Sequence, residues 1–294
     1  MKLSIVTPSY NQGEFIRRTI ESVLTQGCED LEYIVMDGGS SDNTVEILQE
    51  YGRAFYWESK KDKGQADAVN QGIRKAKGDI IGWLNSDDIY YPGAFDAVMD
   101  YFTQNPDVNI VYGNAYHIDS GDNVIEEYYT EDFDFERLKD ICYICQPSLF
   151  FRRSIVDRYG YLDDRLQYCM DYDYWLRLAK HEKFARIDNF IAGSRLYDAN
   201  KTLGSRVKVH DEIAETLKRH FGKVPRRWLY GIAQVKTDAM GIERTIDGHV
   251  NYLYEKKAVF QAAALFIKYN KWIPLKEAKH MIRQLARAWK RRKT

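Results

Sequence analysis

Asp79-Ile80-Ile81-Gly82-Trp83-Leu84 is followed directly by Asn85-Ser86-Asp87-Asp88, and this stretch decides how the rest of the chain is interpreted. The apolar run predicts a buried strand, and its carboxyl end delivers two adjacent carboxylates. Unpaired acids at such a place are costly to keep in a folded protein, so a counter-charge is implied. A divalent metal that carries a phosphorylated ligand suits this arrangement.

The first hundred residues alternate strand and helix signals. The predicted strands cover residues 3–7, 31–36, 55–57 and 79–84, and the predicted helices cover 14–26, 43–51 and 65–77. This βαβαβαβ order predicts an α/β fold with a mostly parallel sheet and helices on both faces.

From Val108 onward the pattern changes. Strand candidates at 108–112 and 115–118 flank a Gly113-Asn114 turn, so a mixed, partly antiparallel extension of the sheet is expected. Further helices are predicted at 131–140, 153–159 and 171–182. After about Ser205 the pattern is helical to the end of the sequence.

Composition excludes some classes of protein. Lys plus Arg equals Asp plus Glu at 43 each, but residues 276–294 hold eight basic residues against the single acid Glu277. The remaining body is therefore mildly acidic, which argues against a nucleic-acid binder. The four cysteines are too few and too scattered to form a disulfide framework, so a reduced, cytoplasmic setting is expected.

Cys142-x-x-Cys145 has the spacing of a redox motif or half a zinc site, but no second pair follows at a suitable distance, which favours plain core cysteines. The amino-terminal residues form one short strand before Pro8, so no signal peptide is predicted. The longest apolar stretch, residues 258–267, is about half of the ~20 residues that a membrane-spanning helix needs. No transmembrane segment is predicted.

Three predicted strand ends carry polar groups suited to a nucleotide. They are Thr7-Pro8-Ser9-Tyr10-Asn11, Asp37-Gly38-Gly39-Ser40-Ser41-Asp42 and Asn85-Ser86-Asp87-Asp88. Ligands of open α/β sheets bind outside the carboxyl ends of the strands. Gly, Ser, Asn and Asp are also common in turns and helix caps, so a purely structural role stays open for most of them. Asp37 is different, because it closes a strand several residues before the cap and can accept the N–H of a pyrimidine base.

Together with Gly64-Gln65-Ala66-Asp67-Ala68-Val69-Asn70-Gln71-Gly72, these segments resemble, in order and spacing, the inverting glycosyltransferases of family 2, which have a GT-A fold. The resemblance covers about residues 2–202. It implies that the segment after the first strand and Asp37 hold the nucleotide base and that Asp67 closes the same pocket. The nucleotide-sugar-binding residues that it implies are Thr7, Pro8, Ser9, Tyr10, Asn11, Asp37, Asp67, Asn85, Ser86, Arg195 and Lys201.

The DxD element of the family falls on Asn85-Ser86-Asp87, so Asn replaces the first acid. The resemblance makes Asp87 the metal ligand, places Ser86 near the ribose and leaves Asp88 as an additional acid. Mg²⁺ or Mn²⁺ in phosphate sites needs one or two carboxylates, because water and phosphate oxygens fill the remaining positions. Asp87 with Asp88 would therefore suffice.

A base for the acceptor hydroxyl is implied by Met170-Asp171-Tyr172-Asp173-Tyr174-Trp175-Leu176-Arg177, which resembles the family pattern before its catalytic helix. The matching base is Asp171. Met170 replaces a common Glu, whose supporting role Asp173 would take. The alternative is that Asp171 is a helix N-cap and Asp173 a first-turn acid. Acceptor-site residues are expected at Gln146-Pro147-Ser148 and at Trp175.

The segment Gly193-Ser194-Arg195-Leu196-Tyr197-Asp198-Ala199-Asn200-Lys201-Thr202 is expected to be a polar loop. It resembles the family's flexible loop over the diphosphate, with Tyr197 where His is usual. Arg195 and Lys201 are the implied diphosphate contacts, although both could also be solvated.

The resemblance implies transfer of a sugar, with inversion, from a nucleoside diphosphate donor to a hydroxyl acceptor on a glycan or a lipid-linked sugar. UDP is the expected nucleotide by family frequency, and synthesis of cell-surface polysaccharide or glycolipid is the expected role. We predict a glycosyltransferase domain over 1–204, with a donor half (1–107) and an acceptor half (108–204), and a helical extension over 205–294.

Two other enzyme classes are disfavoured. A sugar nucleotidyltransferase would need a Gly-rich, Arg-containing loop after the first strand, and a dehydrogenase would need Gly-x-Gly-x-x-Gly there. A non-catalytic nucleotide-sugar-binding or scaffold protein stays open, because Asn85, Met170 and Tyr197 depart from the family pattern.

The carboxyl-terminal residues predict an amphipathic helix. Ile282, Leu285, Ala286 and Trp289 form an apolar stripe beside basic residues. Such a helix can lie on an anionic membrane, which predicts a peripheral position on its inner face. Packing of the helix on the body, with a frayed basic end, is equally open.

Overall fold

The computed structural model describes residues 1–197, 200, 204–246 and 249–291. The chain forms two compact units. The first comprises Met1–Leu138 and Cys142–Asn200, and the second comprises Lys139–Ile141 and Lys201–Thr294. The two functional halves predicted for the first two hundred residues, and the domain boundary at 204, stay predictions.

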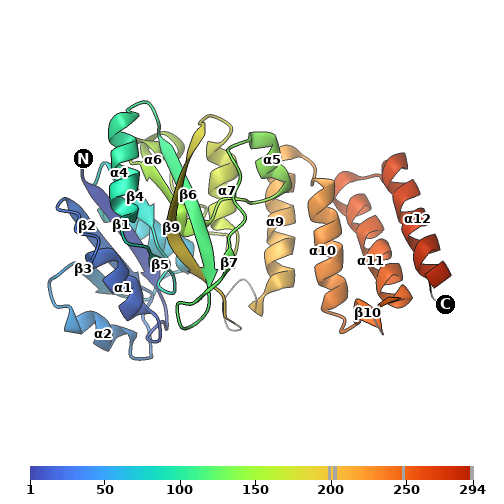
Figure 1. The fold of residues 1–294 in the computed structure, drawn as a ribbon, viewed down its shortest axis with the longest axis horizontal. Coiled ribbons are helices and arrows are strands. Elements are labelled where there is room, and N and C mark those ends of the chain that lie inside the picture. Colours follow the sequence, from blue (N-terminus) through green and yellow to red (C-terminus); the bar gives the residue numbers. More distant parts are fainter. Residues whose placement is uncertain (198–199, 201–203, 247–248, 292–294) are drawn as a thin grey trace. The chain divides into compact units, whose positions relative to one another are not determined.

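The first unit begins with the parallel α/β pattern that the sequence predicts (Figure 1). Its strands are β1 (Leu3–Ser9), β2 (Leu31–Asp37), β3 (Tyr56–Ser59) and β4 (Ile80–Trp83), which pair in parallel in the order β3-β2-β1-β4. The connecting helices are α1 (Ile16–Leu24), α2 (Thr44–Glu50) and α3 (Gln65–Lys75).

Helices cover both faces of this sheet because β1 is apolar on both sides. Ile5 belongs to the buried cluster that contains Ile16 and Ile20 of α1. Its neighbour Val6 faces α3, where an added Cβ on Gly72 would lie 2.3 Å from Val6 Cγ1. Gly72 therefore lets α3 approach the strand closely, and residues of alternate parity on β1 are buried on opposite faces.

Beyond β4 the sheet becomes mixed, as predicted. Its order continues β4-β8-β6-β9-β5, with β7 paired to β6. The strands are β5 (Ile89–Tyr90), β6 (Ile110–Ile118), β7 (Val124–Glu127), β8 (Leu149–Arg152) and β9 (Phe184–Arg195). Strand β8 is antiparallel to both neighbours, whereas β6 and β9 are parallel. The remaining helices of this part are α4 (Ala94–Gln104), α5 (Phe135–Asp140), the 3₁₀ turn η1 (Gln146–Ser148), α6 (Ser154–Tyr159) and α7 (Met170–Leu178).

Two sequence predictions are wrong in this extension. The predicted Gly113-Asn114 turn is a bulge inside the continuous strand β6. Glycine is needed there because an added Cβ would lie 2.3 Å from Ile191 Cγ1 on β9. The predicted polar loop also begins too early, since Gly193 to Arg195 are the last residues of β9 and Gly193 pairs with Ile89.

The second unit is helical, as expected for the carboxyl-terminal part. Its elements are α9 (Arg206–Phe221), α10 (Arg226–Asp238), the hairpin β10 (Thr245–Ile246) and β11 (His249–Val250), α11 (Tyr252–Leu265), the π-helical turn η2 (Phe266–Asn270) and α12 (Leu275–Arg291). Within the described residues, no helix has the length and apolar content that crossing a membrane would require.

Candidate active site

The polar strand ends lie beside one another because β1 is central. Ser9 of β1 pairs with Asp37 of β2, and Val6 pairs with Trp83 of β4. The segments that follow β1, β2 and β4 therefore all leave the sheet at the carboxyl ends of its strands. This is where a parallel sheet offers a ligand site.

Side chains tie the first two of these segments together. Asn11, which has a left-handed φ of 53°, donates its backbone N–H to Ser40 Oγ at 2.7 Å and accepts from the Ser41 N–H at 2.8 Å. Gly13 donates its backbone N–H to Asp42 Oδ2 at 2.9 Å. Asparagine tolerates this backbone conformation better than most residues, so its position is explained by the turn.

Asp37 is buried and fully hydrogen-bonded. Its Oδ2 accepts from the N–H groups of Gly39 (3.1 Å) and Ser40 (2.9 Å) and from Ser59 Oγ (2.6 Å). Its Oδ1 accepts from Ser40 Oγ at 2.5 Å. The predicted contact with a nucleotide base stays a prediction, and a base would have to share or replace these bonds.

Two further acids lie near Asp37. Asp62 faces Gly38 so closely that a Cβ added there would meet its Oδ2 at 2.8 Å. Burial raises the pKa of Asp62, and the charges of Asp67 and Asp37 raise it further. Asp67 Oδ2 accepts from Lys63 N–H at 3.2 Å and from Gln71 Nε2 at 2.9 Å. Sequence reasoning missed Asp62, although it stands two residues before the Gly64-Gln65 motif.

The segment after β1 differs in exposure along its length. Thr7 is buried and accepts a hydrogen bond from the Tyr33 hydroxyl at 3.2 Å, so its side chain belongs to the interior. Pro8 is buried as well. Ser9 is 5% exposed, and its Oγ has no hydrogen-bond partner in the described part of the chain. Tyr10, at 62% exposed, is the accessible aromatic side chain of this segment.

Asn85 is the centre of a polar network at the end of β4. Its Oδ1 accepts from Gln65 Nε2 (2.8 Å) and Trp83 Nε1 (2.9 Å). Its Nδ2 donates to Asp88 Oδ2 (3.2 Å) and Gln146 Oε1 (2.9 Å). An Asp could not donate these two bonds, and it would add a third acid beside Asp87 and Asp88. The Asn that replaces the first DxD acid thus has a physical reason.

The predicted acceptor residues are largely inside the protein. Gln146 also donates to the Trp83 carbonyl at 2.6 Å, and Ser148 donates to the Gly113 carbonyl at 2.9 Å. Pro147 is buried in the same turn. Trp175 is 1% exposed, and its Nε1 has no partner among the described residues. These buried side chains belong to the protein interior beside the site, and their contact with an acceptor stays a prediction.

Asp88 fastens the strand end to β9. Its Oδ1 accepts the backbone N–H of Arg195 at 2.8 Å, and its carbonyl accepts from Thr19 Oγ1 at 2.7 Å. Thr19 also donates to the carbonyl of Ser86, which is itself buried. Burial raises the pKa of Asp88 well above its ordinary value, and the charge of Asp87 raises it further.

Asp87 is bound by a tyrosine. Its Oδ2 accepts a hydrogen bond of 3.0 Å from the hydroxyl of Tyr197, which in turn accepts from Gln12 Nε2 at 3.4 Å. The Tyr197 ring packs on Phe15 with centroids 4.9 Å apart. Burial raises the pKa of Asp87. Sequence comparison identified Tyr197 as a departure from the family pattern but did not predict this contact.

Arg195 is enclosed by protein groups. Its guanidinium donates to the carbonyls of Asp87 (2.6 Å) and Asp119 (2.5 Å), pairs with Asp122 and lies 4.8 Å from the Phe15 ring centroid. Its side chain has no exposed surface. The predicted diphosphate contact would require these bonds to break, and it stays a prediction. Lys201, the other predicted contact, lies outside the described residues.

The acids at the end of β4 suit a metal that is shared with a ligand. Asp87 Oδ1 has no hydrogen-bond partner among the described residues, whereas both oxygens of Asp88 are used. No group of three or more His, Cys, Asp or Glu side chains in the described ranges could hold a metal alone. The donor set therefore fits a hard cation that takes most of its oxygens from phosphate and water.

Asp171 lies in the first turn of α7, which begins at Met170 after the N-cap residue Cys169. The alternative that Asp171 is the N-cap is therefore wrong. Its Oδ1 accepts the N–H of Tyr172 at 2.7 Å. Asn70 of α3 fixes the segment before α7, because its side chain exchanges bonds of 2.9 and 3.0 Å with the backbone of Leu162. Asp173 is buried in the same turn.

Cys145 connects the acid pair electrostatically with Asp171. Burial raises the pKa of the Cys145 thiol well above its ordinary value, and the charges of Asp88, Cys142 and Asp171 raise it further. Asp88 and Asp171 thus act on the same buried group from different elements. The cysteines are free, as the sequence predicts, and Cys145 is buried. That the proposed metal end and base end belong to one site stays a prediction.

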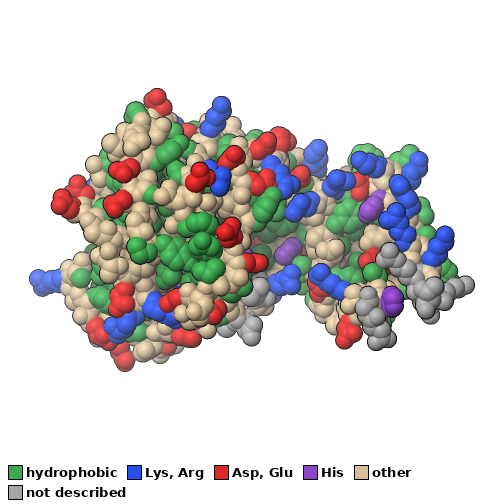
Figure 2. All heavy atoms as spheres, viewed as in Figure 1, with side chains coloured by type: hydrophobic (Ala, Val, Ile, Leu, Met, Phe, Trp, Pro, Cys, Tyr) green, Lys and Arg blue, Asp and Glu red, His purple; other side chains and the backbone are tan. Residues whose placement is uncertain are grey.

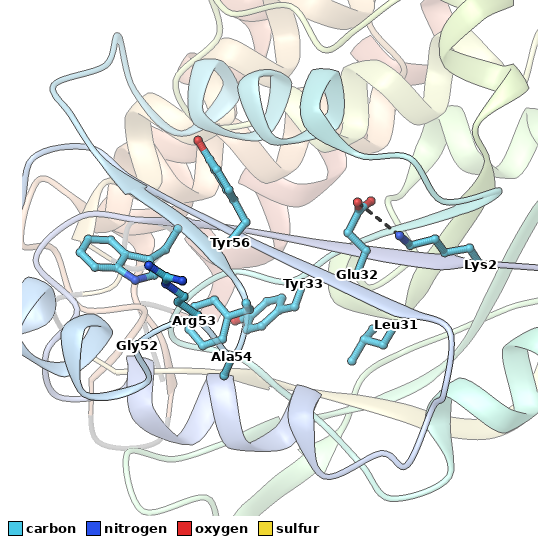
Figure 3. Close-up of a pocket in the computed structure, with 10 residues that line it drawn as sticks. Lys2, Leu31, Glu32, Tyr33, Gly52, Arg53, Ala54 and Tyr56 are labelled. Atoms are coloured by element: carbon cyan, nitrogen blue, oxygen red, sulfur yellow. Dashed lines mark ion pairs between the residues drawn. The ribbon is translucent and has the colours of Figure 1, made fainter.

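A separate hollow of about 480 Å³ lies near the amino ends of β1 and β2 and beside β3 (Figure 3). It is lined by Lys2, Glu32, Tyr33, Arg53 and Tyr56 among others. Lys2 and Glu32 form an ion pair of 3.5 Å. These residues are at the amino ends of β1 and β2 and on β3, so the hollow is not part of the candidate site.

Comparisons with known proteins agree with this arrangement. Residues 4–160 match the family described as Glycosyl transferase family 2. An uncharacterized glycosyltransferase of Methanocaldococcus jannaschii is 28% identical over 74% of this chain and 79% of its own length. The chondroitin synthase of Escherichia coli is 29% identical over 68% of this chain, and the hyaluronan synthase of Pasteurella multocida is 28% identical over 94%. The chain spans 30% and 28% of these two synthases.

Solved structures show the same fold. Staphylococcus aureus TarS 1-349 in complex with UDP-GlcNAc has a TM-score of 0.62 at 14% identity, over 92% of this chain and 82% of that one. The mannosyltransferase PcManGT from Pyrobaculum calidifontis, in complex with GDP-Man and Mn²⁺, has a TM-score of 0.60 at 15% identity, over 98% and 80%. Fold and site thus define a GT-A glycosyltransferase. The chain belongs to glycosyltransferase family 2, whose match covers more than half of it.

Proposed function

We propose that this enzyme transfers a sugar from a UDP-linked donor to a hydroxyl of a glycan or a lipid-linked sugar, with Mn²⁺ or Mg²⁺ and with inversion at the anomeric carbon. The observation that carries the proposal is the acid pair at the end of β4. Asn85 and Arg195 hold Asp88 in place, and Oδ1 of Asp87 has no hydrogen-bond partner among the described residues. That Asp171 serves the same site is part of the proposal.

The reaction exchanges one bond at the anomeric carbon for another and moves one proton. The acceptor oxygen attacks the anomeric carbon, the bond from that carbon to the diphosphate oxygen breaks, and the acceptor proton passes to the carboxylate of Asp171. A positioned base of this kind contributes about 10²- to 10⁴-fold. Asp87, with Asp88 beside it, would hold the metal ion. That ion, when bound, supplies positive charge to the departing diphosphate.

The donor pocket lies at the ends of β1 and β2. Tyr10 offers an exposed ring to the base. Asp37 accepts hydrogen bonds from its own turn and from Ser59 of β3, so we assign the contact with the base N–H to Asp62, with Asp67 beside it. Asp62 Oδ1 accepts from Gly64 N–H at 2.8 Å, which leaves Oδ2 for a ligand N–H.

Two similar proteins support the choice of ligands. TarS binds UDP-GlcNAc in its structure, and PcManGT binds GDP-Man with Mn²⁺. Because the chain is similar to a chondroitin synthase and a hyaluronan synthase, we favour a polysaccharide as the product of this enzyme. A position of the enzyme at the cytoplasmic side of a membrane stays a prediction.

The replacement of the first DxD acid by Asn85 no longer favours a non-catalytic binding protein. Asn85, the departure that most weakened the metal site, makes four hydrogen bonds, and an Asp could not donate the two to Asp88 and Gln146. It is therefore compatible with a working site and does not indicate decay.

A donor panel tests the proposal. The melting temperature of the chain is measured with UDP-, GDP- and dTDP-sugars in the presence of Mn²⁺, Mg²⁺ or EDTA, and release of free nucleotide is then followed for each donor that stabilises. We expect stabilisation by one UDP-sugar with metal and slow metal-dependent hydrolysis of it. Stabilisation by a GDP-sugar alone would contradict the nucleotide, equal stabilisation in EDTA would contradict the metal, and binding without any turnover would favour the non-catalytic alternative.

A further inference from the structure

The second unit exposes an unusual row of large apolar side chains on α11 and η2. Leu253, Phe260 and Ile267 are 50, 60 and 57% exposed and follow one another at intervals of seven residues. Seven residues are close to two helical turns, so the three side chains lie along one line. The buried residues of α11, such as Tyr254, Val259 and Ala262, occupy the other face. The helix is thus apolar on its packed face and on its exposed face.

Helix α12 repeats this pattern. Leu275, Ile282 and Trp289 are 70, 66 and 45% exposed, again at intervals of seven residues. The buried face of α12 is formed by other residues, among them Met281 and Ala288. The exposed row therefore does not contribute to the packing that holds α12 on the unit.

The two rows are joined at both ends. The rings of Tyr252 and Trp289 are in edge contact with centroids 5.3 Å apart, which brings the start of α11 to the end of α12. Trp272, at 63% exposed, lies in the turn between η2 and α12. We call the resulting surface the apolar face. It consists of Leu253, Phe260, Ile267, Trp272, Leu275, Ile282 and Trp289.

Basic side chains border the apolar face. On α12 they are exposed and follow one another at helical spacing, and Figure 2 shows Lys and Arg side chains along this helix. They are Lys276, Lys279, Arg283, Arg287 and Lys290. Lys256, Lys257 and Lys268 are exposed on α11 and η2. Glu277 of α12 is buried and bonded to Arg226 and Tyr230, so it does not offset this charge.

We propose that the apolar face is a docking surface for an anionic lipid bilayer. An apolar row flanked by Lys and Arg suits the boundary between acyl chains and headgroups, and Trp is favoured at that depth. The basic border would attract anionic headgroups. A second copy of the chain is a poorer occupant, because pairing two such faces brings two basic rows to one interface. The surface extends over α11, η2 and α12, beyond the tail helix that the sequence indicates, and does not depend on the identity of the donor.

Vesicle binding tests this assignment. The full chain is sedimented with phosphatidylcholine vesicles, with and without phosphatidylglycerol, at low and high salt. We expect binding to the anionic vesicles at low salt and weaker binding at high salt. The double variant Phe260→Ser with Ile282→Ser should bind at least about tenfold more weakly at an unchanged melting temperature, because both side chains are exposed.

Matched controls separate this surface from exposed apolar groups and charges in general. Val124→Ser with Ile125→Ser removes side chains that are 54 and 53% exposed on β7 of the first unit, and it should leave binding unchanged. Lys279→Glu with Arg283→Glu should weaken binding to anionic vesicles, whereas Lys60→Glu with Lys61→Glu should not.

Two outcomes would overturn the assignment. One is that the wild-type chain fails to sediment with anionic vesicles, or that Phe260→Ser with Ile282→Ser binds them as the wild type does. The other is a dimer in sedimentation velocity without vesicles that this variant dissociates, together with absent vesicle binding, which would assign the apolar face to a second copy.

Discussion

The hydroxyl of Tyr197 donates a 3.0 Å hydrogen bond to Oδ2 of Asp87, the acid to which we assign the metal. Burial raises the pKa of Tyr197, and the charge of Asp87 raises it further, so the phenol remains a donor at neutral pH. In the unliganded chain, Tyr197 thus occupies one of the two oxygens that a cation would use.

Removal of this hydroxyl should make metal binding easier. In Tyr197→Phe the ring can still pack on Phe15, but Asp87 loses a hydrogen bond that competes with a metal for the charge of this carboxylate. Hydrogen bonds to charged groups contribute about 1.5–3 kcal/mol. We expect the Mn²⁺ concentration needed for half-maximal stabilisation by UDP to fall by several-fold. Tyr10→Phe, which removes a hydroxyl from an exposed ring, is the control. A loss of metal-dependent stabilisation would instead make Tyr197 part of the metal-holding group.

Substitution of the two principal acids should separate binding from chemistry. Asp171→Asn keeps the shape of the side chain but removes the base, so transfer should fall by about 10²-fold or more while the donor still binds. Asp87→Ala should abolish transfer and also metal-dependent nucleotide binding. Both quantities can be measured by nucleotide release and by thermal shift with metal. An Asp171→Asn enzyme with near-normal transfer would exclude Asp171 as the base.

Restoring the missing family acid should harm the protein. Asn85→Asp loses two donated bonds, to Asp88 and Gln146, and adds a charge beside two acids. We expect a loss of about 2 kcal/mol in unfolding free energy at neutral pH without any gain in transfer. Asn11→Asp is the matched control, because the Asn11 side chain only accepts hydrogen bonds and its backbone conformation tolerates Asp. Equal stability of the two variants by denaturant titration would contradict the role of Asn85 as a donor.

The raised pKa of Asp88 makes stability depend on pH. Below the ordinary aspartate pKa of about 3.9 the carboxyl is protonated in the folded and the unfolded chain. As pH rises from there through the raised pKa, the unfolded chain releases this proton first, so the contribution of Asp88 to stability decreases. We therefore measure the melting temperatures of the wild type and of Asp88→Asn at a series of pH values. The difference, wild type minus variant, should decrease as pH rises from the ordinary aspartate pKa through the raised pKa of Asp88. A flat difference between the two proteins across this window would contradict the prediction.

Two glycine substitutions should have opposite effects. An added Cβ at Gly113 would clash with Ile191 and the Asn189 carbonyl, at 2.3 and 2.8 Å, so Gly113→Ala should cost about 1–3 kcal/mol. Gly231 lies in α10 with nothing within 4 Å of an added Cβ, so Gly231→Ala should stabilise by up to about 1 kcal/mol. Melting temperatures measure both. Equal shifts would show that the bulge in β6 can relax.

The sequence predicted the first four strands because they are short and mostly apolar and because an amphipathic helix follows each of the first three. It did not predict β9, in whose centre the polar residues Asp188 and Asn189 follow one another, or the continuity of β6. Gly113 and Asn114 are typical turn residues, and only contact with Ile191 shows why glycine stands inside a strand. Local patterns cannot reveal such long-range packing.

The site was predictable in its motifs but not in its internal bonds. The resemblance to the family pointed to Asp87, Asp88 and Asp171, and their roles stay predictions. That Arg195 is enclosed by Asp87, Asp119 and Asp122 depends on contacts across distant elements. Asp62 could have been noticed as an acid beside the Gly64 motif, but its approach to Gly38 is visible only in three dimensions.

The bond between Asp88 and Arg195 also has a consequence for how the protein is made. The two residues are 107 positions apart, and Asn85 and Gln146 are 61 apart. Closing such long loops is slow and comes late in folding. Strands β1 to β4 can leave the ribosome and associate well before β9 is synthesised. A growing chain would therefore present its acidic residues without their partners until Arg195 arrives, and activity should appear only in chains longer than that point.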